Sequence, residues 1–75
     1  MYKVICSNGT PNKSFDILSD AMRYAEDSRK HGDSEISVTK NGILFCRFER
    51  HNYKDFGFSY KRTLTSNYWR EVCGI

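Results

Sequence analysis

The chain has 75 residues, a formal net charge of +3 and 39% hydrophobic residues. This length allows one small domain, and such a domain buries only about 60% of the surface of its unfolded chain. The longest apolar run, Ile43-Leu44-Phe45-Cys46, is too short to cross a membrane. The residues after Met1 lack the basic start and the apolar stretch of a signal peptide. We therefore expect a single domain over residues 1–75 that works in the cytoplasm, away from membranes.

The first element in the chain is a predicted strand. Residues 2–7 alternate between apolar and polar side chains, and Asn8-Gly9 with Pro11-Asn12 marks the turn that follows. Residues 13–15 either extend this strand or form a connector to the next element.

An amphipathic helix should follow, with Asp16 or Ser19 as its N-cap and acidic Asp20 in its first turn. Its apolar face follows the helical spacing of i, i+3, i+4 and i+7, and comprises Leu18, Ala21, Met22, Ala25 and Ser28. The alanines on this face permit close approach to a sheet. Basic residues should occupy the last turn, and Gly32 should end the helix.

Asn41-Gly42 predicts the turn of a β-hairpin, for which two registers are possible. A two-residue turn pairs Val38 with Phe45 but sets Ile36 opposite Arg47. A type I turn with a bulge at Gly42 pairs Val38 with Leu44, Ile36 with Cys46 and Glu35 with Arg47. We favour the second register because it keeps one apolar and one charged face. The residues then expected to meet the helix are Ile36, Val38, Leu44, Cys46 and Phe48, while Ile43, Phe45 and Arg47 face away.

The C-terminal part predicts one more strand and an ambiguous tail. Residues 56–62 alternate after a polar loop at 51–55. Residues 66–75 suit either a short helix capped by Ser66 or an edge strand. The expected fold is α+β, a two-layer β-α-β-β-β arrangement with one helix packed on an antiparallel sheet.

Signatures of catalysis and of metal binding are absent from the sequence. The spacing of Cys6, Cys46 and Cys73 relative to the two histidines matches no zinc pattern, so we expect buried free thiols and no metal or other cofactor. The helix carboxylates at Asp16, Asp20, Glu26 and Asp27 are better explained as a solvated face than as an acid/base pair. We expect a protein that is not an enzyme.

Charge and aromatic residues are unevenly divided along the chain. Residues 36–75 carry seven basic and three acidic side chains, and eight of the eleven aromatic residues. Phe48, Phe56 and Phe58 are expected in the core. Basic residues interleaved with rings can bind single-stranded nucleic acid, and arginine and tyrosine are enriched at protein-binding hot spots. The predicted partner-binding surface consists of Arg47, Tyr53, Lys54, Tyr60, Lys61 and Arg62.

The order of elements over residues 2–62 resembles that of small accessory proteins of bacteriophages, including small anti-CRISPR proteins. The resemblance is carried by a strand, a helix that opens Leu18-Ser19-Asp20-Ala21, and an Asn-Gly hairpin of aromatic strands. It implies a compact, non-enzymatic protein that binds and blocks a complex in the cytoplasm of a bacterial host. It implies no particular site residue, and the positive charge argues against the acidic DNA mimics.

The sequence therefore indicates two alternative functions. The first is an inhibitor of a host protein or of a protein–nucleic acid complex, and the second is a small basic nucleic-acid-binding module. Salt separates them, since nucleic-acid binding releases counterions and weakens steeply as salt rises.

Overall fold

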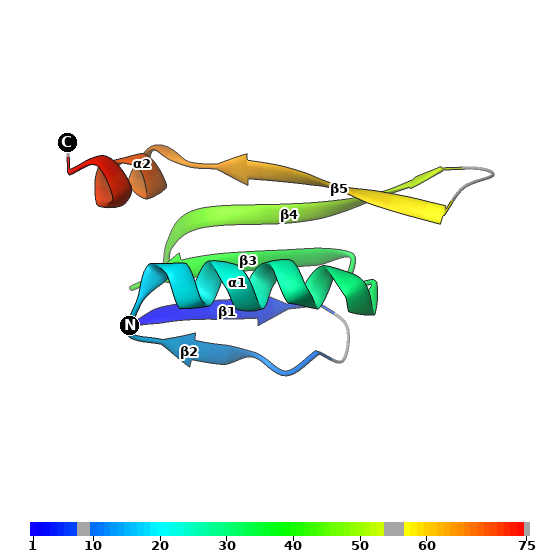
Figure 1. The fold of residues 1–75 in the computed structure, drawn as a ribbon, viewed down its shortest axis with the longest axis horizontal. Coiled ribbons are helices and arrows are strands. Elements are labelled where there is room, and N and C mark those ends of the chain that lie inside the picture. Colours follow the sequence, from blue (N-terminus) through cyan, green and yellow to red (C-terminus); the bar gives the residue numbers. More distant parts are fainter. Residues whose placement is uncertain (8–9, 54–56, 75) are drawn as a thin grey trace.

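The computed structural model describes residues 1–7, 10–53 and 57–74, with Tyr53 described by its backbone alone. An antiparallel five-stranded sheet in the order β2-β1-β3-β4-β5 carries two α-helices. The predicted α+β class and the β-α-β-β-β order are confirmed, with α2 added at the C-terminal end (Figure 1). The elements are β1 (Tyr2–Cys6), β2 (Lys13–Phe15), α1 (Leu18–Ser28), the 3₁₀ turn η1 (Arg29–His31), β3 (Glu35–Lys40), β4 (Ile43–Tyr53), β5 (Gly57–Leu64) and α2 (Ser66–Cys73).

Residues 13–15 form a separate strand rather than an extension of the first. β2 pairs antiparallel with β1, with Phe15 opposite Tyr2 and Lys13 opposite Val4. The other edge of β1 pairs with β3, where Val4 lies opposite Val38. The first strand is therefore central in the N-terminal half of the sheet, which explains why Val4 is fully buried.

Helix α1 presents the predicted face to the sheet. Ala21 and Ala25 are fully buried, and half-buried Leu18 and Met22 pack against the same core. Ser28 is also buried on this face, and its hydroxyl is satisfied by donating to the carbonyl oxygen of Tyr24 at 2.8 Å. α1 itself ends at Ser28, and the basic residues expected in its last turn form the 3₁₀ turn η1 instead. The helical segment as a whole ends at Gly32 as predicted, with the left-handed φ of 77° that glycine adopts freely.

The predicted N-caps of α1, Asp16 and Ser19, are wrong. Ile17 occupies the cap position in an extended conformation, with no side-chain cap. The start of the helix is set by packing. Phe15 ends β2 and Leu18 begins α1, with two residues between them. Because both side chains pack against the core, they fix where the chain leaves the strand and enters the helix.

The β3–β4 hairpin follows neither predicted register. Asn41 and Gly42 both have positive φ, as a two-residue type I′ turn requires, and Lys40 pairs with Ile43. A one-residue bulge then follows, because Thr39 pairs with Leu44 whereas Val38 pairs with Cys46.

Phe45 is the extra residue of this bulge. The bulge shifts the pairing so that apolar residues of β3 again lie opposite apolar residues of β4. It moves Ile36 from the position opposite Arg47 to the position opposite Phe48. The prediction that Phe45 faces away is wrong: its ring is 5% exposed and meets the ring of Tyr2 edge-on at 5.7 Å. Leu44 is also displaced from the expected helix-facing set, since it pairs with Thr39 on the other face.

The C-terminal third forms a long hairpin and a helix. β4 continues through residues 51–53, so the predicted polar loop is wrong there, and residues 54–55 lie outside the described residues. The tail is helical, and its cap is Thr65 rather than Ser66. The Thr65 hydroxyl donates to two carbonyl oxygens, that of Leu44 at 2.7 Å and that of Phe45 at 3.1 Å. This contact fastens the start of α2 to the bulge of β4.

The core lies between α1 and the middle strands, and its largest fully buried side chain is Phe48. The core position expected for Phe58 is wrong, since this ring is 45% exposed, and Phe56 lies outside the described residues. The three thiols are free, as expected. Cys46 is buried and Cys6 half-buried, but the expected burial is wrong for Cys73, which is exposed at the end of α2.

Candidate binding surfaces

The residues predicted as one partner-binding surface are divided between the two faces of the sheet. In the β4–β5 pairing, Arg62 lies opposite Phe48 and Lys61 lies opposite Glu49. Because side chains alternate along a strand, Tyr60 and Arg62 share the face of the buried Phe48, which α1 covers. Arg47 and Lys61 lie on the other face. The structure describes Tyr53 by its backbone alone, and Lys54 lies outside the described residues.

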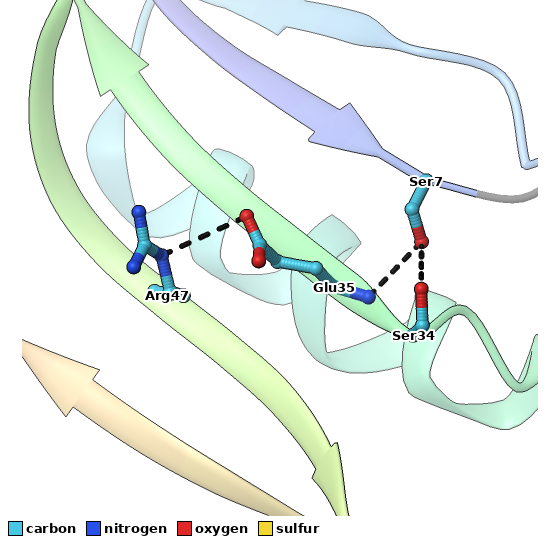
Figure 2. Close-up of polar contacts among 4 residues, drawn as sticks. All are labelled: Ser7, Ser34, Glu35 and Arg47. Carbon is cyan, nitrogen blue, oxygen red and sulfur yellow. Dashed lines mark hydrogen bonds and ion pairs between the residues drawn. The ribbon is translucent and has the colours of Figure 1, made fainter.

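On the uncovered face the basic side chains stand beside acidic ones. Figure 2 shows Arg47 reaching toward Glu35 across β3 and β4, with Nε and Oε1 3.7 Å apart. The Glu35 amide donates to the Ser7 hydroxyl at 3.0 Å, and the hydroxyls of Ser7 and Ser34 are 2.9 Å apart (Figure 2). Lys61 is the direct cross-strand neighbour of Glu49. This face is thus a surface of mixed charge rather than a basic patch.

On the helix-bearing face, Tyr60 and Arg62 attach β5 to the helical layer. The Tyr60 hydroxyl donates to the carbonyl oxygen of Asp33, and burial raises the pKa of this phenol. Arg62 pairs with Glu26 of α1 at 3.5 Å. Both predicted residues therefore have structural partners within the fold.

A basic cleft lies beside them, between the end of α1 with η1 and the β4–β5 hairpin. It measures about 450 Å³ and is lined by Glu26, Arg29, Lys30, Phe58, Ser59 and Tyr60. The Arg50 guanidinium lies 5.4 Å from the centre of the Phe58 ring, and it donates to the carbonyl oxygen of Gly32. Tyr60 meets Phe58 edge-on at 5.7 Å. The exposed ring is therefore held in place by its neighbours.

A larger groove lies between α1 and helix α2, and it extends from the residues before α1 along that helix as far as Glu26. It measures about 740 Å³, and its lining is Tyr2, Asp16, Ile17, Leu18, Ser19, Met22, Arg23, Glu26, Tyr68, Glu71 and Val72. The Tyr2 hydroxyl donates to the Glu71 carboxylate, which also lies 3.9 Å from the ammonium of Lys40. The hydrogen bond to Glu71 and burial both raise the pKa of Tyr2. These contacts hold α2 against the sheet and keep the groove formed.

Exposed apolar side chains gather at the end of the molecule that carries α2, the groove end (Figure 1). Large hydrophobic residues that are exposed in the described structure are Met1, Ile5, Ile17, Ile43, Phe58, Trp69 and Val72. Five of the seven belong to the groove end. Ile17 and Val72 line the groove, Trp69 lies on α2, Met1 precedes Tyr2, and Ile43 pairs with Lys40. Both ends of the described chain and the β3–β4 turn lie toward this side of the molecule (Figure 1).

Sequence reasoning missed Ile17, Trp69 and Val72. Ile17 had no usable signal, because it lies four residues before Ala21 and so continues the helical spacing, whereas its exposure follows from its extended position just before α1. Trp69 and Val72 had none either, since their exposure depends on the tail being a helix and on where that helix packs.

The described residues contain no group of three or more side chains suited to holding a metal ion. Neither described helix has the length and apolar character needed to span a membrane. No protein-family model, curated protein or solved structure matches this chain.

Proposed function

We propose that this protein is a small, non-enzymatic binding protein that attaches to another protein through the groove between α1 and α2. In line with the resemblance to phage accessory proteins, it acts as an inhibitor of a host protein or protein–nucleic acid complex in the bacterial cytoplasm. The observation that carries the proposal is the gathering of exposed apolar side chains around this groove.

The chemistry of the groove suits a protein segment with apolar side chains. Its floor includes half-buried Leu18, Met22 and Tyr68, while Ile17 and Val72 stand at 58% and 54% exposure. Covering such side chains removes apolar surface from water, which stabilises association by about 25 cal/mol per Å² before the costs of ordering. Methionine adapts to irregular partners, and both methionine and tyrosine are enriched in interface cores.

Charged groups at the rim supply orientation. Asp16 and Arg23 line the groove, while Glu26 and Glu71 already have basic neighbours in Arg62 and Lys40. The rim is therefore nearly balanced in charge, so binding there should depend more on apolar burial than on salt.

The test compares apolar-to-acidic changes inside and outside the groove. A partner recovered from bacterial lysate with the wild-type protein is identified, purified and titrated against the variants by calorimetry. Ile17→Asp and Val72→Asp should each weaken binding at least about tenfold, a loss of about 1.4 kcal/mol. Both residues are exposed, so circular dichroism should show an intact fold.

The matched control is Ile5→Asp, which places the same charge on an exposed isoleucine of the uncovered sheet face. It should bind the partner like the wild type. Equal losses in all three variants, or full binding by the two groove variants, would contradict the proposal.

A further inference from the structure

We propose that the basic cleft between η1 and the β4–β5 hairpin binds single-stranded nucleic acid. A base stacks on Phe58, and phosphates lie against Arg29 and Lys30. This site shares only Glu26 with the lining of the α1–α2 groove, and it does not depend on the function proposed for that groove.

The electrostatic part rests on a local excess of positive charge. The cations at the cleft are Arg29, Lys30, Arg50 and Arg62, and the acidic side chains facing them are Glu26 and the buried Asp33. Arg62 is matched by Glu26, which leaves three cations against the one carboxylate of Asp33, a local surplus of two positive charges. Lys30 is exposed, and no ion pair of the described residues includes it. Such a surplus attracts phosphates and is the main source of sequence-independent affinity for nucleic acid.

The aromatic part rests on Phe58. A phenylalanine 45% exposed on a hairpin has no core role, yet its position is fixed by Arg50 on one side and Tyr60 on another. Arg50 is itself held by the carbonyl oxygen of Gly32. A ring that is exposed and already ordered can stack with a base at little entropic cost.

The combination selects the class of ligand. An acidic protein segment would use the cations but gain little from an exposed ring, whereas every nucleobase has a face that stacks on it. A duplex keeps its bases stacked on each other, so the ring favours a single strand. The cleft volume of about 450 Å³ falls within the usual range of sites for small organic groups.

The experiment measures fluorescence anisotropy of a labelled oligothymidylate of ten nucleotides, titrated with the full chain at several salt concentrations. The wild type should bind at low salt and weaken steeply as salt rises. Phe58→Ala should weaken binding about fivefold to 100-fold through loss of stacking. Lys30→Glu should weaken binding and also flatten the salt dependence.

Two matched variants keep the result specific. Lys61→Glu makes the same charge change on the opposite face of β5, and it should bind within about twofold of the wild type because that face makes no phosphate contact. Ile17→Asp alters only the groove and should bind the oligonucleotide fully, so failure here is distinguishable from failure of the proposed function.

Several outcomes would overturn the inference. One is absence of binding by the folded wild type at low salt. Another is an equal loss in Lys30→Glu and Lys61→Glu, which would indicate attraction to net charge alone. A third is full binding by Phe58→Ala together with equal displacement by polyglutamate, which would make the cleft a site for acidic protein.

Discussion

The two ends of the molecule differ in what covers the sheet. At one end, α2 and the first turns of α1 enclose an apolar groove, around which Ile17, Trp69 and Val72 are exposed. At the other end the last turn of α1 and the short η1 turn lie beside the β4–β5 hairpin, and they form a basic cleft with an exposed phenylalanine. The hairpin extends beyond α1 in Figure 1.

The difference follows from the lengths of helices and strands. Helix α1 and strand β4 each have 11 residues. A helix rises 1.5 Å per residue and a strand about 3.3 Å, so α1 spans about 16 Å and β4 about 36 Å. One helix therefore covers less than half of the long strand. Helix α2 covers one end of the sheet, and charged and aromatic side chains lie over the other end.

The largest expected effect comes from the core residue that lies beneath the basic end. Phe48 is fully buried, and the Arg29 guanidinium lies 5.6 Å from its ring centre. Phe48→Ala should lower the free energy of unfolding by about 3–5 kcal/mol, measured by urea denaturation. Phe58→Ala should change it by less than about 0.5 kcal/mol, because that ring is exposed. Similar losses for the two variants would mean that Phe58 belongs to the core after all.

A smaller loss of stability is expected from the β3–β4 turn at the groove end. Gly42 has a φ of 79° with no atom within 4 Å of an added Cβ, so a substitution there meets backbone strain and no clash. Gly42→Val should cost about 1–2 kcal/mol. Gly42→Asn is the control, since asparagine tolerates the left-handed region, and it should cost clearly less by thermal denaturation. Equal costs would show that φ at this turn is not what limits the side chain.

The attachment of α2 can be loosened without changing the hairpin. Tyr2→Phe removes the hydroxyl that donates to Glu71 and should cost on the order of 1 kcal/mol. Hydrogen exchange of amides in α2 should accelerate, while exchange in β5 stays unchanged. Faster exchange at both ends would show that the two regions are coupled.

A titration tests the core between the ends. Burial raises the pKa of the Cys46 thiol from 9.0 to about 11. Above pH 9 the unfolded chain therefore releases this proton before the folded protein does, so Cys46 makes stability fall as pH rises toward 11. Below pH 9 the thiol is protonated in both states and this contribution is constant. Denaturation across pH 8–10 should show a shallower fall in Cys46→Ala than in the wild type. Identical slopes would place Cys46 in contact with water.

Local rules predicted the parts of the fold that neighbouring residues determine. Residue spacing predicted the apolar face through Ala21 and Ala25. The freedom of glycine to adopt positive φ predicted the end of the helical segment at Gly32 and the turn at Gly42. The register did not follow, because the bulge at Phe45 satisfies the burial of both Phe45 and Cys46, which only the assembled core requires.

The candidate surfaces were less accessible to sequence reasoning for a similar reason. A count of charges along the chain cannot tell that Lys61 lies across from Glu49 or that Arg62 pairs with Glu26. The cleft joins Arg29 and Lys30 of one segment to Phe58 of another, and the groove needs a helix that the sequence left undecided.

The most direct test of two separate binding surfaces is a two-by-two binding measurement. The purified partner and the labelled oligothymidylate are each titrated with folded Val72→Asp and folded Lys30→Glu. Val72→Asp should lose the partner and keep the oligonucleotide, and Lys30→Glu should do the reverse. Loss of both ligands in either variant would contradict the division of the molecule into an apolar, protein-binding end and a basic, nucleic-acid-binding end.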